Sequence, residues 1–265
     1  MAEGTVNNDV GGILWWRSEA LTALDGLVHG FSCRSGGVSR GEQLNLAARP
    51  WDTDEALAEN WRRALASLHP GLSPQRLALV SQVHGAKVVT VDRGLGPMKT
   101  VAEADGVVCR AAGTPIAVRT ADCVPVLLAV PGRGVAAVHA GWRGTAKGVV
   151  ARGVVSLCEA TGAAPIEVVA AVGPRIAGVD YEVGDEVVEA LCATGVARGD
   201  IVVGRSERRR PLVDVGLAVR SQLHALGVGV IEVHEGSTAR SDRWWSHRRD
   251  GERAGRQAAV IARWA

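Results

Sequence analysis

Apolar residues gather in short runs along this chain, and most runs end at glycine, proline or a polar residue. Runs of four to eight apolar residues with such boundaries are typical of β-strands. The clearest pair covers residues 124–130 and 135–138, joined by a Pro-Gly turn. Strands joined by a tight turn pair antiparallel, so residues just outside their far ends meet. The pattern therefore predicts that Cys123 and His139 are neighbours in space.

Apolar residues at helical spacing predict the helices. Such spacing runs from residue 53 to residue 68, where Asp52 or Thr53 can cap the helix and a Pro-Gly pair ends it. Asp214 is placed to cap another helix. The remaining predicted elements are helices over 145–159, 183–191 and 215–226, an edge strand or entry segment over 13–24, and strands over 27–31, 77–83, 87–91, 106–110, 116–119, 168–172, 228–233 and 257–264.

These elements favour an α+β fold. Strands outnumber helices and several are joined as hairpins, while the regular strand–helix alternation of a doubly wound parallel sheet is missing. A chain of 265 residues that is 47% hydrophobic can bury a full core. We therefore expect a mixed-sheet α/β sandwich and a single domain over residues 1–265.

Charge and cysteine usage narrow the class of protein. The formal net charge is +2, and the basic run at residues 205–210 is interpreted as a solvated loop, so nucleic acid is not an expected partner. The five cysteines are scattered without a CxxC pair, and the first twelve residues show no signal peptide. No stretch of about 18 apolar residues predicts a membrane span. The expected setting is the cytoplasm, with the oligomeric state left open.

Three residues carry candidate metal chemistry: His84, Cys123 and His139. Two imidazoles and a thiolate match a zinc site with three protein ligands and one open position. Their spacings of 39 and 16 residues match no local zinc-finger pattern. A mechanism without metal is an alternative, in which His139 deprotonates Cys123 for attack on a carbonyl or amide. The third interpretation is a buried structural cysteine beside two unrelated histidines.

Other polar residues suggest contacts to an anion or a substrate. The loop over residues 29–39 is rich in glycine and serine and carries Arg34, a composition suited to approaching an anion, although this stretch alone favours a surface turn. A helix beginning after His139 would offer free N–H donors near Arg143. Asn45 lies between two leucines and needs a hydrogen-bond partner if it is buried.

An ordered set of motifs resembles the YfiH-like family, also known as the multicopper polyphenol oxidoreductase or laccase-like family. The match extends over nearly the whole chain. Each motif is short, but the ordered set is highly specific. The motifs are HGFSCRSGGVS (29–39), LNL (44–46), the Glu59-Asn60 pair, SQVHG (81–85), ADGVV (104–108), TADCVP (120–125), HAGWRG (139–144), GPRI (173–176) and SHRRDG (246–251).

The resemblance implies an α/β sandwich and a purine nucleoside phosphorylase that cleaves adenosine, inosine and methylthioadenosine with phosphate to free base and ribose 1-phosphate. It also implies an adenosine deaminase activity. The metal ligands of the family carry over to His84, Cys123 and His139, with zinc as the expected metal and copper as the alternative. Two departures, Ser237 in place of a cysteine and His247 in place of a tyrosine, bear on substrate preference.

Phosphorolysis gives these residues provisional roles. We expect Arg34 and Arg143 to bind phosphate, with Asn45 as a further substrate contact. Gln82 and Asp122 are candidates for orienting the ligands or contacting the purine, and for deamination Asp122 is a candidate proton carrier.

The sequence is also compatible with three other functions. One is a cysteine hydrolase that edits peptidoglycan precursors with Cys123 and His139, because some relatives are described as editing factors. Another is a copper-dependent polyphenol oxidase, which the sequence disfavours because one His-Cys-His set and seven histidines in all offer too few ligands for several coppers. A binding protein without catalysis is the last.

Overall fold

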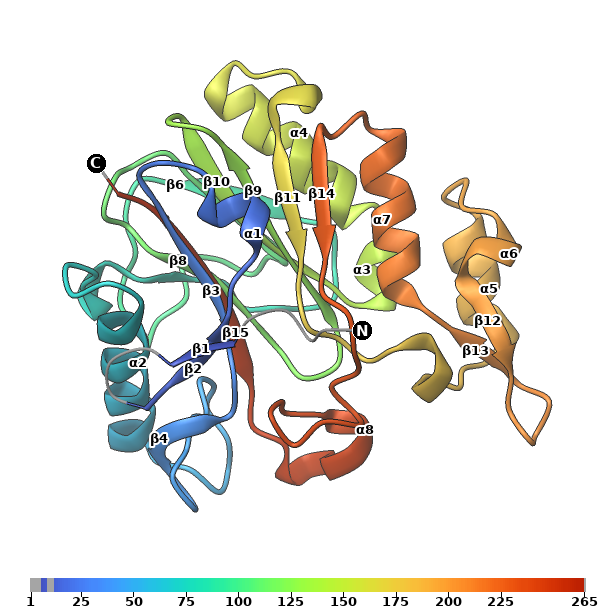
Figure 1. Ribbon diagram of the computed structural model, residues 1–265, viewed down its shortest axis with the longest axis horizontal. Helices are drawn as coiled ribbons and strands as arrows, with labels where there is room; N and C mark the ends of the chain where they lie inside the picture. Colours follow the sequence, from blue (N-terminus) through green and yellow to red (C-terminus); the bar gives the residue numbers. More distant parts are fainter. Residues whose placement is uncertain (1–5, 9–11, 265) are drawn as a thin grey trace.

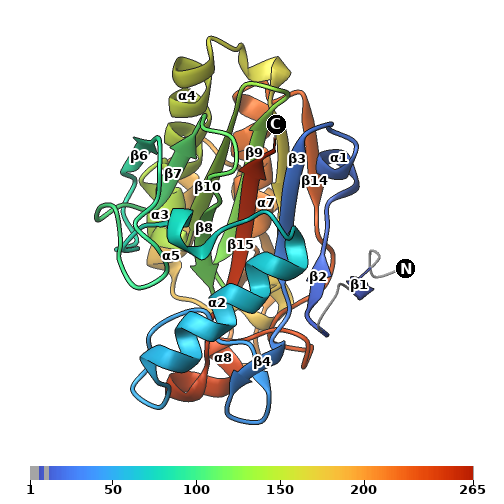
Figure 2. The same cartoon turned by 90° about the vertical axis from the view of Figure 1, so that its left-hand side faces the viewer.

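The computed structural model describes residues 6–8 and 12–264 and shows two six-stranded sheets packed face to face, with helices on both outer faces (Figures 1 and 2). The predicted mixed-sheet sandwich is confirmed. The N-terminal stretch interpreted as lacking a signal peptide falls mostly outside the described residues. None of the described helices is long and apolar enough to cross a membrane.

The first sheet places the C-terminal strand at its centre. It pairs antiparallel with neighbours on both sides, and only the edge strand β5 runs parallel to its neighbour. In spatial order the strands are β1 (Val6–Asn8), β2 (Leu14–Trp16), β3 (Leu27–Ser32), β15 (Gln257–Arg263), β8 (Ile116–Thr120) and β5 (Ala78–Leu79).

The second sheet is built around the predicted hairpin. Its two strands pair antiparallel at the centre, whereas the strand at each edge runs parallel to its neighbour. Side chains from the facing surfaces of both sheets, such as Phe31, Ile116 and Leu127, fill the core between them. In spatial order the strands are β14 (Val230–Val233), β11 (Val169–Val172), β9 (Val124–Val130), β10 (Gly134–Ala140), β7 (Gly106–Cys109) and β6 (Val88–Val91).

Helices cover the outer faces of both sheets. Figure 2 shows α2 lying across the first sheet, and its buried Trp61 and Leu65 pack against that face. Thr53 caps α2 by accepting the Ala56 N–H, which confirms the predicted start. Helices α4 and α7 cover the second sheet. The helices are α1 (Glu19–Thr22), α2 (Asp54–Leu68), α3 (Trp142–Ala146), α4 (Val149–Thr161), α5 (Asp185–Cys192), α6 (Arg198–Ile201), α7 (Val215–Ala225) and α8 (His247–Asp250), with 3₁₀ turns at Pro74–Arg76, Pro165–Glu167, Gly178–Asp180 and Gly251–Arg253.

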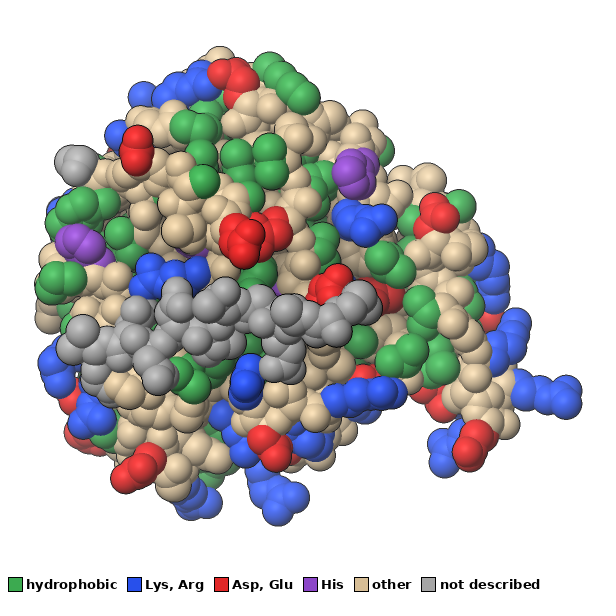
Figure 3. Space-filling model, viewed as in Figure 1, with side chains coloured by type: hydrophobic (Ala, Val, Ile, Leu, Met, Phe, Trp, Pro, Cys, Tyr) green, Lys and Arg blue, Asp and Glu red, His purple; other side chains and the backbone are tan. Residues whose placement is uncertain are grey.

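A small lobe stands beside the sandwich (Figure 1). It contains α5, α6 and a hairpin of β12 (Val202–Arg205) and β13 (Pro211–Val213). The basic run at residues 205–210 is largely exposed around the turn of this hairpin, and Figure 3 shows Lys and Arg side chains projecting from the lobe. The sequence predicted the helix of this lobe over 183–191 but not its hairpin.

Several predicted boundaries were wrong. The helix predicted over 145–159 is two helices, because the chain turns at Gly148, whose φ of 82° interrupts the helix. The strand predicted over 77–83 shortens to β5 and one bridge at Ser81. The segment predicted over 13–24 is a strand followed by a short helix with Ser18 as its cap. Residues 35–39, interpreted as loop, form β4 (Ser35–Ser39).

Candidate metal centre and adjoining pocket

His84, Cys123 and His139 converge at one end of the second sheet. One ligand atom from each side chain lies within 4.8 Å of the other two. The Cys123 Sγ and His84 Nε2 atoms are 3.9 Å apart, and the two imidazole rings meet edge to face with centroids 4.9 Å apart. His139 is buried, Cys123 is half-buried and His84 is exposed. The cluster is therefore open to solvent on the His84 side.

Two different parts of the fold position these ligands. Antiparallel pairing of β9 with β10 sets Val124 opposite Ala140, so Cys123 lies at the mouth of the hairpin near His139. The predicted proximity of Cys123 and His139 is confirmed. His84 comes from the loop between β5 and β6 and adopts a left-handed backbone with φ 56°, which is uncommon for a residue with a side chain.

Asp105 links the two histidines. Its buried carboxylate accepts a hydrogen bond from His139 Nδ1 at 2.8 Å and hydrogen bonds from backbone N–H groups of the His84 loop. The bond to Nδ1 fixes the tautomer of His139 and leaves its Nε2 as the nitrogen available to a metal.

The electrostatics of the cluster favour a charged thiolate. Burial works to raise the pKa of the Cys123 thiol, but the charge and hydrogen bonds of His139 and His84 outweigh it and lower the pKa to about 6. Burial likewise works to lower the pKa of His139, but Cys123 and Asp105 raise it to about 9. Burial works to raise the pKa of the Asp105 carboxyl, but the hydrogen bonds from His139 and from backbone N–H groups outweigh it and lower the pKa. A thiolate is the form of cysteine that binds metal.

The geometry fits a metal ion. Ligand atoms of a tetrahedral zinc site lie about 3.5 Å apart, and the Cys123 Sγ and His84 Nε2 atoms are 3.9 Å apart. The residue opposite the cluster is Gly141, and a Cβ at this position would lie 3.0 Å from His84 Cδ2 and 3.1 Å from Cys123 Sγ. The missing side chain keeps space open beside the ligand atoms. Two nitrogens and one sulfur suit zinc, and they also suit copper.

A pocket of about 500 Å³ adjoins the cluster. Its wall contains Arg119 and Arg256. Among the hydrogen bonds of residues 6–8 and 12–264, both guanidinium groups donate only to backbone carbonyl oxygens, and neither forms an ion pair with a carboxylate there. Burial lowers the pKa of both guanidinium groups. The lining residues are Ala47, Ala48, Ser81, Gln82, His84, Arg119, Thr120, Ala121, Cys123, His139, His247 and Arg256.

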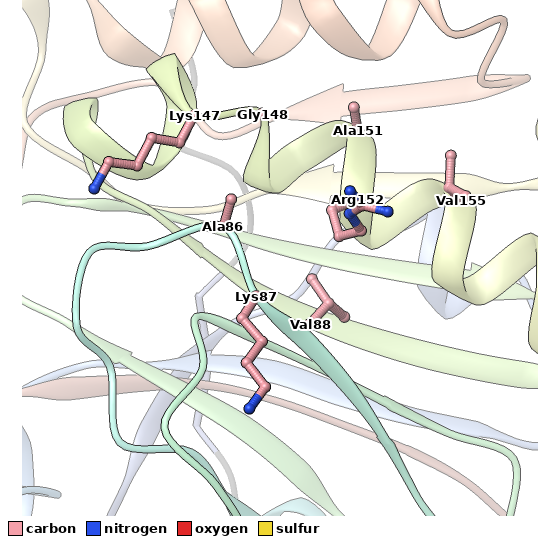
Figure 4. Close-up of a pocket in the computed structure, with 8 residues that line it drawn as sticks. All are labelled: Ala86, Lys87, Val88, Lys147, Gly148, Ala151, Arg152 and Val155. Atoms are coloured by element: carbon pink, nitrogen blue, oxygen red, sulfur yellow. The ribbon is translucent and has the colours of Figure 1, made fainter.

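Two other hollows are less suitable as the substrate site. A recess of about 50 Å³ on another side of Cys123 is lined by Trp142 and Tyr181 and is too small for a nucleoside. A groove of about 720 Å³ lies between β6 and α4, and Figure 4 shows the side chains of its Lys87 and Lys147 pointing in different directions. None of the candidate site residues lines that groove. The metal cluster and the 500 Å³ pocket are therefore the best-formed candidate site.

Comparison with known proteins identifies the family. A family model described as multi-copper polyphenol oxidoreductase laccase matches residues 28–264. The chain belongs to this family. Two relatives are named purine nucleoside phosphorylase. The protein from Deinococcus radiodurans is 39% identical over 236 residues, which is 88% of each chain. The protein from Streptomyces coelicolor is 39% identical over 241 residues, covering 90% of this chain and 96% of the relative.

Two solved structures share the fold of this chain. YlmD from Geobacillus stearothermophilus superposes with a TM-score of 0.88 at 31% identity, over 98% of this chain and 99% of that chain. YfiH from Bacillus licheniformis superposes with a TM-score of 0.86 at 24% identity, over 97% and 98% of the two chains. These similarities support the predicted sandwich along nearly its whole length.

Among the predicted substrate contacts, Gln82 alone lines the pocket. Its side chain makes two hydrogen bonds to the backbone of Arg119, at 2.7 and 2.9 Å. Asn45 is fully buried, and its amide oxygen accepts the N–H groups of Ala47 and Arg256. Both residues therefore hold parts of the pocket wall.

Asp122, Arg34 and Arg143 lie outside the pocket lining. The Asp122 carboxylate accepts the Thr238 hydroxyl and the Arg248 N–H, each at 2.6 Å, and so ties two C-terminal segments to the cluster. The Arg34 guanidinium lies 3.8 Å from the Asp250 carboxylate. The exposed Arg143 stacks on its neighbour, the Trp142 ring.

Sequence patterns did not single out Asp105, Arg119 or Arg256 of this site. They also did not predict that His247 lines the pocket. Asp105 lies in the ADGVV motif, but the sequence patterns assigned it no role in the site. Arg119 ends a predicted strand, and Arg256 precedes another. A charged residue at a strand end could have indicated a site residue, but many strand ends carry charged residues without a role in a site. Only the packing of the two sheets brings these particular ends together.

Proposed function

We propose that this protein is a zinc-dependent purine nucleoside phosphorylase, cleaving adenosine, inosine and methylthioadenosine with phosphate. The observation that carries the proposal is the cluster of His84, Cys123 and His139, which opens onto a pocket with two arginines. Neither arginine pairs with a carboxylate of the described residues. Relatives named purine nucleoside phosphorylase at 39% identity support it. A pocket of about 500 Å³ has room for a nucleoside together with phosphate.

Phosphorolysis makes two demands on the pocket. Phosphate must be held beside the anomeric carbon, and negative charge that develops on the departing purine must be stabilised. We assign phosphate binding to Arg119 and Arg256, because both line the pocket and their guanidinium groups pair with no carboxylate in the described part of the chain. Gln82 keeps Arg119 in place through two hydrogen bonds to its backbone, and Asn45 holds Arg256 through one, accepted from the Arg256 backbone N–H.

His247 is our candidate for the purine end of the substrate. It lines the pocket, and its Nδ1 lies 3.1 Å from the Gly251 carbonyl oxygen, to which it donates. That bond leaves Nε2 to interact with a ring nitrogen of the base. His247 replaces a tyrosine expected from the family resemblance, so this position is also a candidate for setting nucleoside preference.

The metal would be held by His84 Nε2, Cys123 Sγ and His139 Nε2. Bound zinc supplies a Lewis acid that polarises an oxygen ligand in its open position. The same centre is the basis for our proposal of adenosine deamination. Asp122 has both carboxylate oxygens engaged with Thr238 and Arg248, so we assign it to holding the C-terminal segments. Arg34 and Arg143 are placed to support the surrounding loops.

A second candidate function follows from the lowered pKa of Cys123 beside His139, which suits a thiol nucleophile. Such an enzyme would hydrolyse an amide, including those of peptidoglycan precursors. It would keep its activity after metal chelation and lose it on alkylation. A copper phenol oxidase has less support, because the described residues hold one cluster of three ligands.

We place the protein in the cytoplasm with small nucleosides and phosphate as its partners. All five cysteines are unpaired, which fits a reducing compartment.

Inosine turnover with and without phosphate tests the proposed function. Zinc-loaded protein should release hypoxanthine only when phosphate is present, and chelation should stop the release. Because Cys158 lies on α4 outside the pocket lining, Cys158→Ala serves as a control that retains activity. Absence of release from inosine, adenosine and methylthioadenosine by zinc-loaded protein would refute the phosphorylase assignment, and activity that survives chelation would favour the thiol enzyme.

A further inference from the structure

The Asp105 carboxylate accepts four hydrogen bonds inside the protein. Its Oδ1 lies 2.8 Å from His139 Nδ1 and 3.0 Å from the His84 backbone nitrogen. Its Oδ2 accepts the N–H groups of Val83 at 3.2 Å and Gly85 at 2.7 Å. The side chain is fully buried. One carboxylate therefore contacts the residues that carry two of the three candidate metal ligands.

The contacts to the backbone account for the shape of the His84 loop. The backbone N–H groups of three successive residues donate to the Asp105 carboxylate and not to a neighbouring strand. They lie where the strand predicted over 77–83 ends early. His84 has the left-handed φ of 56° within this turn, a conformation that side-chain-bearing residues rarely adopt without support. A negative charge with three N–H donors supplies that support, because bonds to an ionised acceptor are stronger than neutral ones.

Backbone contacts hold Asp105 itself in place between the two ligands. The His139 N–H donates to the Asp105 carbonyl oxygen at 2.7 Å, and the Asp105 N–H donates to the Lys87 carbonyl oxygen at 2.9 Å. Asp105 directly precedes β7, which pairs with β10. The carboxylate is thus fixed to the rigid sheet, whereas the His84 loop is exposed. The rigid part can dictate the geometry of the loop.

We propose that Asp105 is the positioning residue of the metal centre: it orients the His139 ring and builds the turn that presents His84. The inference rests on the proposed function insofar as the three side chains bind a metal. Beyond the proposed function, Asp105 would fix the relative positions of His84 and His139, which come from separate parts of the chain.

The chemistry of the carboxylate explains why an amide cannot replace it. All four partners are donors, and a carboxylate has only acceptor atoms. In Asp105→Asn one oxygen is replaced by an NH₂ group, which would face N–H donors at the same short distances. At least one set of contacts must break, so His139 or the His84 loop changes position.

Zinc affinity of the full chain, measured by competition with a chromophoric chelator, tests the inference. Asp105→Asn should bind zinc at least about tenfold more weakly than wild type, in the range found for residues that orient metal ligands. The matched control is Glu103→Gln, an exposed carboxylate two residues away, which should bind zinc as wild type does. Zinc affinity of Asp105→Asn within twofold of wild type would overturn the proposal.

A spectrum separates positioning from general loss of structure. Cobalt bound to wild type should show a thiolate-to-metal charge-transfer band and the visible bands of a tetrahedral site. Folded Asp105→Asn, checked by circular dichroism, should show altered visible bands at saturating cobalt because two ligands have moved. An unchanged cobalt spectrum in the variant would contradict the assigned role.

Hydrogen exchange in wild type tests the same contacts if the variant does not fold. The amides of Val83, His84 and Gly85 lie in an exposed loop, yet their N–H groups should exchange at least about tenfold more slowly than unprotected amides. Exchange at unprotected rates would overturn the proposal. Phosphorolysis is measured separately: zinc-loaded wild type without turnover would refute the proposed function while leaving the zinc, cobalt and exchange results to decide the role of Asp105.

Discussion

The Nε2 atom of His84 lies 3.9 Å from the Sγ atom of Cys123, although 39 residues separate them in the chain. Cys123 belongs to the mouth of the β9–β10 hairpin, and His84 belongs to a loop held from the sheet by Asp105. The contact therefore depends on how these two distant segments pack together.

Replacing Cys123 by alanine should remove both bound zinc and turnover. The change deletes the only sulfur ligand of the cluster, and loss of the metal should lower kcat for inosine at least about a thousandfold. Metal content by mass spectrometry and hypoxanthine release measure the two effects. The matched control, Cys158→Ala, should keep both. A Cys123→Ala protein that is active and zinc-replete would exclude the metal site.

Replacing Arg256 by methionine should weaken phosphate binding selectively. The change removes a guanidinium from the pocket wall and keeps an unbranched side chain, so the KM for phosphate should rise roughly 10- to 100-fold, as expected for lost bonds to a charged group. The KM for inosine should change little. Arg143→Met is the matched comparison, because Arg143 stacks on Trp142 outside the pocket lining. If Arg143→Met alone raised the phosphate KM, the original assignment to Arg143 would be correct.

Replacing Gly141 by alanine should disturb the centre through one methyl group. The backbone φ of −68° at Gly141 accepts alanine, so the effect comes from contacts of about 3.0 Å to His84 and 3.1 Å to Cys123. Overpacking of this kind costs about 1 to 3 kcal/mol, and we expect zinc affinity to fall by about tenfold or more. Gly199→Ala on α6 is the control, because a Cβ there meets nothing within 4 Å. Equal zinc affinities for both variants would argue against the crowded geometry.

Stability should fall as the pH decreases from about 6.5 to 4. Burial, reinforced by Arg175, lowers the pKa of His234 to about 4 in the folded protein. In the unfolded chain His234 binds a proton as the pH falls through 6.5, whereas in the folded protein it stays neutral down to a pH of about 4. The stabilisation from burying neutral His234 is therefore fully present above pH 6.5 and is lost as the pH falls towards 4. The slope is at most about 1.4 kcal/mol per pH unit for one histidine.

Urea unfolding at pH 7 and pH 5 measures this effect. His234→Phe should reduce the pH dependence relative to wild type, and packing between Trp16 and Trp244 should accept the aromatic ring. The exposed His224 on α7 provides the control, since His224→Gln should leave the pH dependence unchanged. An identical pH dependence for wild type and His234→Phe would contradict the assignment.

Sequence patterns predicted the elements that depend on local periodicity. The amphipathic run from 53 to 68 and the paired apolar strands around the Pro-Gly turn were placed within a few residues. Elements with mixed patterns were missed, including the β12–β13 hairpin and the break between α3 and α4 at Gly148. A break of this kind depends on one residue with positive φ, to which helical periodicity is insensitive.

The sequence by itself determined the sandwich class, the hairpin that joins Cys123 to His139, and the ligand types that suit zinc. Local hydrogen bonding and apolar periodicity act over a few residues, so this information is present in the chain order. Only the tertiary structure decided that His84 meets that hairpin, that Asp105 contacts both histidines, and that Arg119 and Arg256 line the pocket while Arg34 and Arg143 do not. These relationships come from the packing of two sheets, which brings together loops that no local pattern connects.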